Sequence, residues 1–192
     1  KTIYLSATSV YGNHNGKWVN EKSVLKPSSD FGKSRLIAEK RWLKLNKNSK
    51  LNLIILRLSG IYSRENNPIK RLKSGPKIYI SKKNQFFSRI RVEDISRTIK
   101  KIFENKKICN EIINVSDDLP ASSENVTKFA SKLLNIKKLK PISFQKLEGK
   151  MIRSFYRDSK KVSNKKMKKL MKIKLLYPTY KTGLKNLYNK SF

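Results

Sequence analysis

The chain has 192 residues and a formal net charge of +33, since 46 lysines and arginines stand against 13 acidic residues. The length suffices for one substantial core, while one cysteine (Cys109) and one histidine (His14) exclude an internal disulfide framework and a His/Cys metal cluster. No apolar run is long enough to span a membrane, so we expect a cytoplasmic protein with no metal site and no membrane partner.

The first part of the chain shows a strand, a helix and a second strand. Residues 2–6 (TIYLS) form a short apolar run typical of a buried parallel strand. Residues 12–27 are polar and rich in turn formers, which predicts a loop. A polar cap at 28–30 can start a helix that continues to about Leu45, and residues 51–62 are the most strand-like stretch. This order predicts a βαβ unit with a parallel sheet.

The remainder of the chain alternates shorter elements. An irregular basic segment at 63–87 contains one β-rich run, KIYIS. Helical periodicity follows, then another short strand and two further helices, the last of them rich in lysine. We expect these elements at residues 91–104, at 111–116, from Ser122 or Ser123 onward, and near 163–172.

The segment from Leu5 to Glu39 carries a specific frame: a strand, then Val10-Tyr11-Gly12, then a helix with Phe31 four residues before Arg35. This frame resembles the catalytic segment of the extended short-chain dehydrogenases/reductases, the NAD-dependent epimerase/dehydratase family. In that family a Ser/Thr ends the strand and the helix carries Tyr-x-x-x-Lys. The resemblance places Ala7 on the Ser/Thr, Phe31 on the tyrosine and Arg35 on the lysine, so the triad is degenerate.

These replacements change the chemistry that the resemblance implies. The family tyrosine is a general acid/base whose phenol ionises near neutral pH, whereas Phe31 has no ionisable proton and Ala7 has no hydroxyl. Arg35 keeps a positive charge that can donate to ribose hydroxyls, but it is effectively never deprotonated. Enzymatic activity therefore stays open, and the substitutes that we consider near the expected site are Thr8, Tyr11 and Tyr62.

Further motifs extend the resemblance over nearly the whole chain, the last three being similar to an atypical bacterial branch of nucleoside-diphosphate-sugar epimerase-like proteins. They are RLSGIY at 57–62, FSRIRVEDI at 87–95, NVSDDLP at 114–120, RSFY at 153–156, KVSN at 161–164 and YPTY at 177–180. The resemblance implies an α/β fold, the C-terminal half of a Rossmann-like doubly wound parallel sheet with a smaller α/β substrate-binding lobe. It assigns 1–118 to a partial NAD(P)-binding domain, with part of the lobe inserted near 63–87, and 119–192 to the C-terminal lobe.

The glycine fingerprint of the family, G-x-x-G-x-x-G after a first strand, does not occur in the sequence. Gly12 and Gly16 follow the wrong strand and have the wrong spacing. We therefore interpret the chain as the C-terminal portion of a longer protein, with Lys1 roughly at the fifth strand of the dinucleotide fold. NAD or NADP is expected as the cofactor of the full-length protein, and the chain alone is expected to bind it poorly.

The same resemblance indicates which residues contact ligands. Cofactor contacts are expected from Ser6, Arg35, Ser59, Gly60 and Ile61. Since arginine forks match phosphate and carboxylate groups, the expected substrate contacts are Tyr11, Arg57, Arg89, Arg91, Arg153 and Tyr156. Asp94 is expected to cap a helix or to form a buried ion pair, and the 30–45 helix is expected to form a homodimer.

Three functions stay open. The leading hypothesis is an NAD(P)-dependent epimerase/dehydratase-like oxidoreductase that acts on a nucleotide-sugar or a similar anionic substrate. The alternative is a non-catalytic dinucleotide-binding redox sensor or assembly module, favoured by the absent tyrosine. The third, nucleic-acid binding, is favoured by charge alone. Because the lysines are spread along the chain and accompany abundant Asn and Ile, we interpret most of the charge as genomic base composition on a solvated surface.

Overall fold

The centre of the protein is a parallel sheet of three strands, β1 (Thr2–Ala7), β3 (Leu53–Leu58) and β7 (Glu111–Val115), in the order β1-β3-β7. The computed structural model describes residues 1–49 and 51–190, except for the side chains of 150–152 and 154. Every residue of β3 is buried, as a central strand covered on both faces requires. The expected βαβ unit with a parallel sheet is confirmed.

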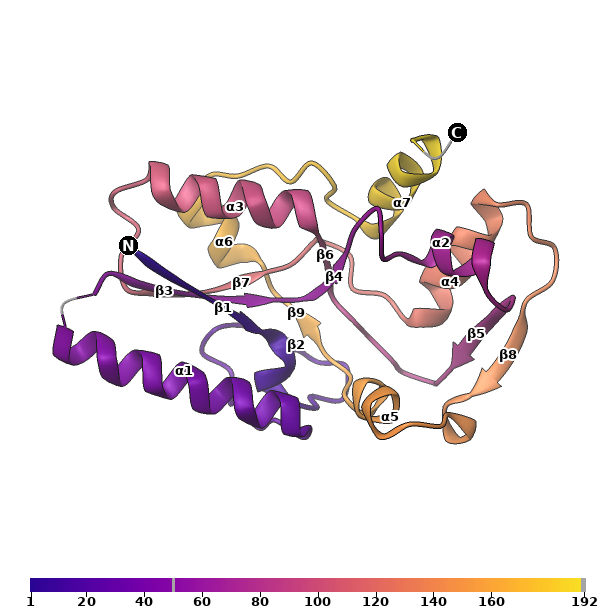
Figure 1. Cartoon of the computed structure of the whole chain (residues 1–192), viewed down its shortest axis with the longest axis horizontal. Helices are drawn as coiled ribbons and strands as arrows, with labels where there is room; N and C mark the ends of the chain where they lie inside the picture. The colour runs from indigo at the N-terminus through magenta and orange to yellow at the C-terminus, as the bar shows by residue number, and fades with distance from the viewer. Residues whose placement is uncertain (50, 191–192) are drawn as a thin grey trace.

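Helices cover both faces of this sheet (Figure 1). α1 (Asp30–Ser49) lies along one face, and α3 (Val92–Glu104) and α6 (Lys165–Met171) lie on the other. The core that α3 and α6 share with the sheet consists chiefly of Ile54, Leu56, Ile113, Ile95, Ile102, Met167 and Met171. The segment after residue 118, assigned to the lobe by resemblance, thus also contributes to the core of the sheet.

The strand-like stretch at 51–62 forms two strands rather than one. β3 stays in the sheet, while β4 (Gly60–Tyr62) leaves it and pairs in parallel with β6 (Arg89–Arg91). The separation occurs at Ser59, whose amide donates to the last carbonyl of β7 at 3.0 Å, whereas the Gly60 amide turns to the carbonyl just before β6 at 3.0 Å. This break carries the chain from the sheet into a second lobe.

The second, smaller lobe is built from α2 (Pro68–Ser74), α4 (Ser123–Leu133) and α7 (Tyr180–Asn189), with β5 (Ile78–Ser81) paired in parallel with β8 (Lys140–Ser143) at its edge. The Ser122 hydroxyl caps α4, as expected, by accepting from the Asn125 amide. The sequence patterns did not predict α2 and α7. The lobe core consists of Tyr62, Ile69, Leu72, Ala121, Val126, Ala130, Tyr180, Leu184 and Leu187.

Short elements complete the chain and join the two parts. They are η1 (Thr8–Tyr11), β2 (Trp18–Val19), η2 (Phe144–Lys146), α5 (Lys150–Arg157) and β9 (Lys161–Val162). β2 pairs in parallel with β9, which brings the predicted loop at 12–27 against the segment that follows α5. Within the described residues, no helix is both long enough and apolar enough to cross a membrane.

Candidate functional site at the carboxyl ends of the strands

A cavity of about 650 Å³ lies where the carboxyl ends of the sheet strands meet the lobe. β1 and β3 contribute their last residues, Ala7 and Leu58, α1 contributes Phe31 from its first turn, and α7 contributes Tyr180 and Leu184. In open α/β sheets, ligands bind in the crevice outside the carboxyl ends of the parallel strands. The volume also matches that of ordinary small-molecule sites. Position and size together make this cavity the candidate functional site.

The sheet end of the cavity carries the positions that resemble the catalytic triad. Ala7 and Phe31 border it, together with Thr8, and the Phe31 ring is 59% exposed. Arg35, one turn further along α1, places its guanidinium carbon 4.9 Å from the Phe31 ring centroid and donates to the Leu5 carbonyl at 2.9 Å. Arg35 itself does not border the cavity. The spacing of the triad is kept, but its phenol and amine are not.

Residues 59–62 border the cavity where β3 passes into β4. They include Ser59, Gly60 and Ile61, from which cofactor contacts were predicted, and Tyr62, considered as a substitute acid/base. The Ser59 and Tyr62 hydroxyls are buried and have no hydrogen-bond partner among the described residues. Buried polar groups nearly always have a partner, so both hydroxyls are exceptions, and the Tyr62 hydroxyl lies against Gly183 of α7. Burial, reinforced by the charge of Asp117, raises the pKa of the Tyr62 phenol, so this hydroxyl stays neutral at physiological pH.

The lobe end of the cavity is aromatic and cationic. The Phe87 and Phe155 rings are stacked with centroids 4.5 Å apart, and Tyr156 meets Phe87 edge-on at 5.6 Å. Arg89 donates to the Ala121 carbonyl at 2.8 Å. Burial lowers the pKa of Arg89 to about 10, which still leaves it charged at neutral pH. Aromatic faces beside a guanidinium suit a planar ring and an anionic group. Arg89 and Tyr156, from which substrate contacts were predicted, border the cavity.

Asp117 is a buried acid close to this end of the cavity. It is 1% exposed, one carboxyl oxygen accepts from the Leu119 amide at 3.3 Å, and the other has no partner among the described residues. Burial raises the pKa of Asp117 to about 8, although the charge of Arg89 acts in the opposite direction. The carboxyl group is therefore largely protonated at neutral pH.

Three residues expected to contact ligands, Ser6, Tyr11 and Arg57, lie instead in a buried polar network that joins β1, η1, α1 and β3. Glu39 accepts from Ser6 Oγ at 2.6 Å and from Arg57 Nη2 at 2.7 Å. The Tyr11 hydroxyl accepts from Arg57 Nη1 at 2.9 Å and donates to Asn114 Oδ1 at 2.7 Å. None of these side chains borders the cavity. Their polar atoms are engaged in holding the elements of the fold together. The predictions that Tyr11 is a substitute acid/base and that Arg57 binds an anionic substrate are therefore not supported by their positions.

Two further arginines expected to contact substrate are also placed elsewhere. Arg91 is 2% exposed, and it pairs with Glu93 at 2.8 Å and donates to the Gly183 carbonyl at 2.9 Å. Arg153 borders a separate surface hollow beside Lys82 and Arg157 rather than the main cavity. Arg91 therefore joins β6 to α7, and Arg153 lies on the outside of α5.

Asp94 is buried and forms an ion pair with Arg97, which is itself 39% exposed, so the expected buried ion pair is buried on one side only. Its carboxylate is 3.3 Å from Arg97. It also accepts from the amides of Leu176 and Tyr177 at 2.8 and 2.9 Å. The side chain thus fixes the segment that leads into α7.

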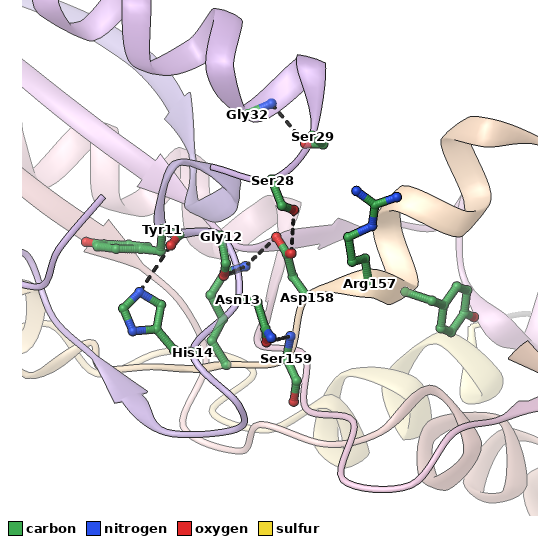
Figure 2. A network of polar contacts seen from close by, with 12 residues as sticks. Tyr11, Gly12, Asn13, His14, Ser28, Ser29, Gly32, Arg157, Asp158 and Ser159 are labelled. Carbon is green, nitrogen blue, oxygen red and sulfur yellow. Dashed lines mark hydrogen bonds and ion pairs between the residues drawn. The ribbon is translucent and has the colours of Figure 1, made fainter. Parts of the chain in front are cut away.

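No sequence pattern suggested the contacts between distant segments beside the cavity, or several of the residues that line it. Ser28, just before α1, donates to Asp158 at 2.6 Å, and Asn13 accepts from the Ser159 amide at 3.0 Å (Figure 2). These contacts join segments about 130 residues apart or more, so no local motif could mark them. The unexpected lining residues include Asn66, Asn67, Arg71, Ser123, Asp158 and Lys160.

A parallel sheet with helices on both faces and a ligand-sized cavity at the carboxyl ends of its strands defines a Rossmann-like α/β protein. The sequence model of the NAD dependent epimerase/dehydratase family matches residues 1–116. The chain belongs to this family. No curated protein sequence matches the chain significantly.

Solved structures agree with this fold. A conserved protein of unknown function from Silicibacter pomeroyi is 35% identical, with a TM-score of 0.91 over 98% of this chain and 66% of that one. UDP-glucuronic acid 4-epimerase from Bacillus cereus, solved with UDP-glucuronic acid and NAD, is 22% identical, with a TM-score of 0.79 over 97% of this chain and 60% of that one. dTDP-glucose 4,6-dehydratase from Bacillus anthracis, solved with NAD, is 20% identical, with a TM-score of 0.78 over 97% of this chain and 60% of that one. The chain thus spans between 60% and 66% of the length of these relatives.

Proposed function

We propose that the complete protein is an NAD(P)-linked oxidoreductase of the epimerase/dehydratase type that binds a nucleotide-sugar or a similar anionic substrate in the 650 Å³ cavity. The observation that carries this proposal is the arrangement of the cavity. The carboxyl ends of β1 and β3 form one end, and Arg89 with the stacked Phe87 and Phe155 rings forms the other. A sugar placed between these ends would lie beside Ser59, Gly60 and Tyr62, which border the cavity.

The described residues fit only one end of a dinucleotide. Gly60 has no side chain and Ile61 is 49% exposed, so both leave room beside the Ser59 hydroxyl for a flat ring and its ribose. No glycine fingerprint is present to receive a pyrophosphate at a helix N-terminus. The bound dinucleotide would supply the hydride acceptor, and most of its binding surface would come from outside these 192 residues.

A second function, dinucleotide binding without turnover, is favoured by one specific observation. Phe31 and Ala7 both border the cavity at the positions that resemble the family tyrosine and Ser/Thr. Neither side chain can transfer a proton. A redox-sensing or assembly module needs the fold and the cofactor but not that proton transfer.

Binding and turnover measurements on the complete protein separate the two functions. Thermal shift with NAD(H), NADP(H) and UDP-glucuronic acid should raise the melting temperature for at least one dinucleotide and for the nucleotide-sugar. Isotope transfer from a nucleotide-sugar, labelled at the carbon that carries the reacting alcohol, to NAD⁺ or NADP⁺ should then reveal hydride transfer. No stabilisation by any of these ligands would refute both functions, whereas dinucleotide binding without exchange on any nucleotide-sugar would leave the non-catalytic module.

Restoring the triad gives a second test. The variant Ala7→Thr, Phe31→Tyr, Arg35→Lys supplies a hydroxyl, a phenol and an amine at positions that keep the required spacing. Hydride exchange should rise in this variant if the rest of the cavity is competent. Unchanged exchange, with ligand binding intact, would favour the non-catalytic function.

The proposal includes a homodimer through α1. Two apolar side chains on one side of this helix, Ile37 and Leu45, are 52% and 49% exposed. Helix packing would remove this apolar surface from water. Light scattering should give twice the chain mass, and Ile37→Lys should reduce it to one, whereas Val24→Lys in the loop before α1 should not. A monomeric parent protein would contradict the dimer.

A further inference from the structure

Lys160 and Asp158 form an ion pair in the wall of the same cavity that Phe31 and Ala7 border. The Lys160 Nζ lies 3.5 Å from Asp158 Oδ2, and the two side chains are 12% and 11% exposed. Burial of this degree separates them from the many solvated lysines of the chain. The pair is thus a cavity feature rather than part of the basic surface.

The surrounding loops hold both members in place. Ser28 donates to Asp158 Oδ1 at 2.6 Å, so the segment leading into α1 fixes the carboxylate (Figure 2). Lys160 Nζ donates to the Gly12 carbonyl at 3.0 Å. The backbone on either side of the lysine is also held. Before it, the Ser159 amide donates to Asn13 Oδ1 at 3.0 Å, and after it, β9 pairs with β2. A group positioned from three separate segments is preorganised, as proton transfer requires.

The hydrogen bonds of Lys160 leave one direction free. A lysine ammonium has three N–H donors, and two partners are found for them among the described residues, the Gly12 carbonyl and Asp158. The neutral amine would keep two N–H groups for these partners and carry a lone pair in the third direction. Lys160 is also one of the residues that border the cavity, so a ligand there would lie beside it.

The electrostatic setting favours a change of protonation state. Burial lowers the pKa of the Lys160 amine below its ordinary value, and Asp158 offsets part of that effect. Of the other charged groups nearby, Lys82 interacts with Asp158, while His14, in the neighbouring loop, has its Nε2 3.1 Å from the Tyr11 carbonyl and does not border the cavity. A buried lysine with a lowered pKa serves as a general base in other enzymes.

We propose that Lys160, paired with Asp158, is the proton-accepting group of the cavity. It takes the acid/base role that the family gives to a tyrosine at the position of Phe31. This inference rests on the proposed function. A substrate alcohol loses its carbon-bound hydride to an oxidant of the nicotinamide dinucleotide class. Its O–H bond breaks, the proton forms a new N–H bond with the neutral Lys160 amine, and a carbonyl group remains. In the reverse direction the Lys160 ammonium returns the proton to the alkoxide.

The first experiment measures Lys160 without any turnover. Competitive acetylation of the intact protein between pH 6 and 10, read by mass spectrometry, reports the pKa of each lysine amine. Lys160 should titrate below Lys168, the matched control, which pairs with Asp118 at 2.6 Å outside the cavity. UDP-glucuronic acid should protect Lys160 and not Lys168. If Lys160 titrates with Lys168, or is modified equally with and without bound UDP-glucuronic acid, the inference is overturned.

The second experiment uses variants of the complete protein. Lys160→Met should lower hydride exchange by about 10²- to 10⁴-fold, the usual contribution of a general base, and should remove the lower limb of the pH profile. Lys160→Arg keeps the charge but cannot deprotonate, so it should bind UDP-glucuronic acid normally and lose exchange equally. Lys168→Met should retain both.

Different results would refute the proposed function and the role of Lys160. A parent protein that binds neither dinucleotide nor UDP-glucuronic acid refutes the proposed function. A parent protein that exchanges hydride, with Lys160→Arg equally active and its pH profile unchanged, refutes only the role of Lys160.

Discussion

Glu39 on α1 and Arg57 on β3 form a bidentate ion pair whose side chains are 1% and 2% exposed, with Arg57 Nη2 2.7 Å from Glu39 Oε2. Although burial alone would lower the pKa of Arg57, its bonds with Glu39 and Tyr11 raise it above the usual value. The arginine is thus charged in the core and depends on Glu39 for its compensation. The pair fixes α1, and with it Phe31, against the sheet.

Removal of Glu39 should therefore destabilise the fold strongly. Breaking one partner of a buried pair leaves an uncompensated charge and costs about 3–5 kcal/mol, so Glu39→Ala should lower the free energy of unfolding by that amount in urea denaturation. The control is Glu65→Gln, which breaks the exposed pair with Lys70 at 2.6 Å and should leave the urea midpoint nearly unchanged. Equal effects of the two substitutions would contradict the role given to the buried pair.

Asp117 should make stability fall as pH rises through the neutral range. In the unfolded chain this carboxyl ionises near the ordinary value of 3.8, whereas in the folded protein its pKa is about 8. Between these values the folded state binds more protons than the unfolded state, so the contribution of Asp117 to stability decreases from about pH 4 to about pH 8 and is constant above. Below pH 4 both states are protonated and no penalty arises.

The substitution Asp117→Asn tests this dependence. The amide keeps the acceptor for the Leu119 amide and cannot ionise, so the variant should gain stability relative to the parent as pH rises from 5 to 8. Urea unfolding at pH 5, 6.5 and 8 measures the difference. A difference that does not change with pH would show that Asp117 is ionised in the folded protein throughout.

Gly183 and Tyr62 should be coupled. A Cβ at position 183 would overlap the Tyr62 hydroxyl and lie 2.8 Å from its Cζ, and the hydroxyl has no partner among the described residues that would hold it. In an ordinary helix Gly→Ala stabilises by about 1 kcal/mol, but here Gly183→Ala should destabilise by about 1–3 kcal/mol through overpacking. The first observable is therefore the sign of the change in the free energy of unfolding, measured by urea unfolding.

A double-mutant cycle identifies the cause. Tyr62→Phe removes only the hydroxyl that the new methyl group meets, so the double variant should recover part of the loss caused by Gly183→Ala. The coupling should exceed about 0.5 kcal/mol, the size found for residues in contact. Additive effects would place the overlap elsewhere in α7.

The sequence predicted the sheet well because its signals are local. The apolar runs at 2–6 and 51–62 and the polar cap at 28–30 each depend on neighbouring residues, and the structure contains the corresponding elements. α2 was not predicted because it is short and has few apolar positions, whereas α7 was missed although Tyr180, Leu184, Leu187 and Tyr188 have helical spacing. Their local signals were present, namely Asn67 before Pro68 in α2 and the Thr179–Thr182 capping box in α7.

The site was predictable only where one segment supplies several of its residues. Residues 59–62 border the cavity together because β4 continues directly from β3. Arg57, two residues earlier, pairs with Glu39 on α1. Periodicity could not identify this partner, because nothing in the sequence distinguishes Glu39 from a solvent-exposed helix glutamate. Asp158 and Lys160 reach the cavity through contacts with Ser28 and Gly12, about 130 and 148 residues away, and such pairings follow from the fold rather than from any pattern.

Phe155 provides the most direct test of the cavity as a ligand site. Its ring stacks on Phe87 with centroids 4.5 Å apart and borders the cavity, yet it is 55% exposed, so Phe155→Ser should cost little stability. If a nucleotide base lies against these rings, loss of stacking worth about 1–3 kcal/mol should weaken binding of UDP-glucuronic acid by about 5- to 150-fold in calorimetry. Phe103 on α3 is 56% exposed and does not border the cavity, so Phe103→Ser is a matched control that should leave affinity unchanged. Equal affinities of the two variants would place the base elsewhere, because they differ only in which phenylalanine faces the cavity.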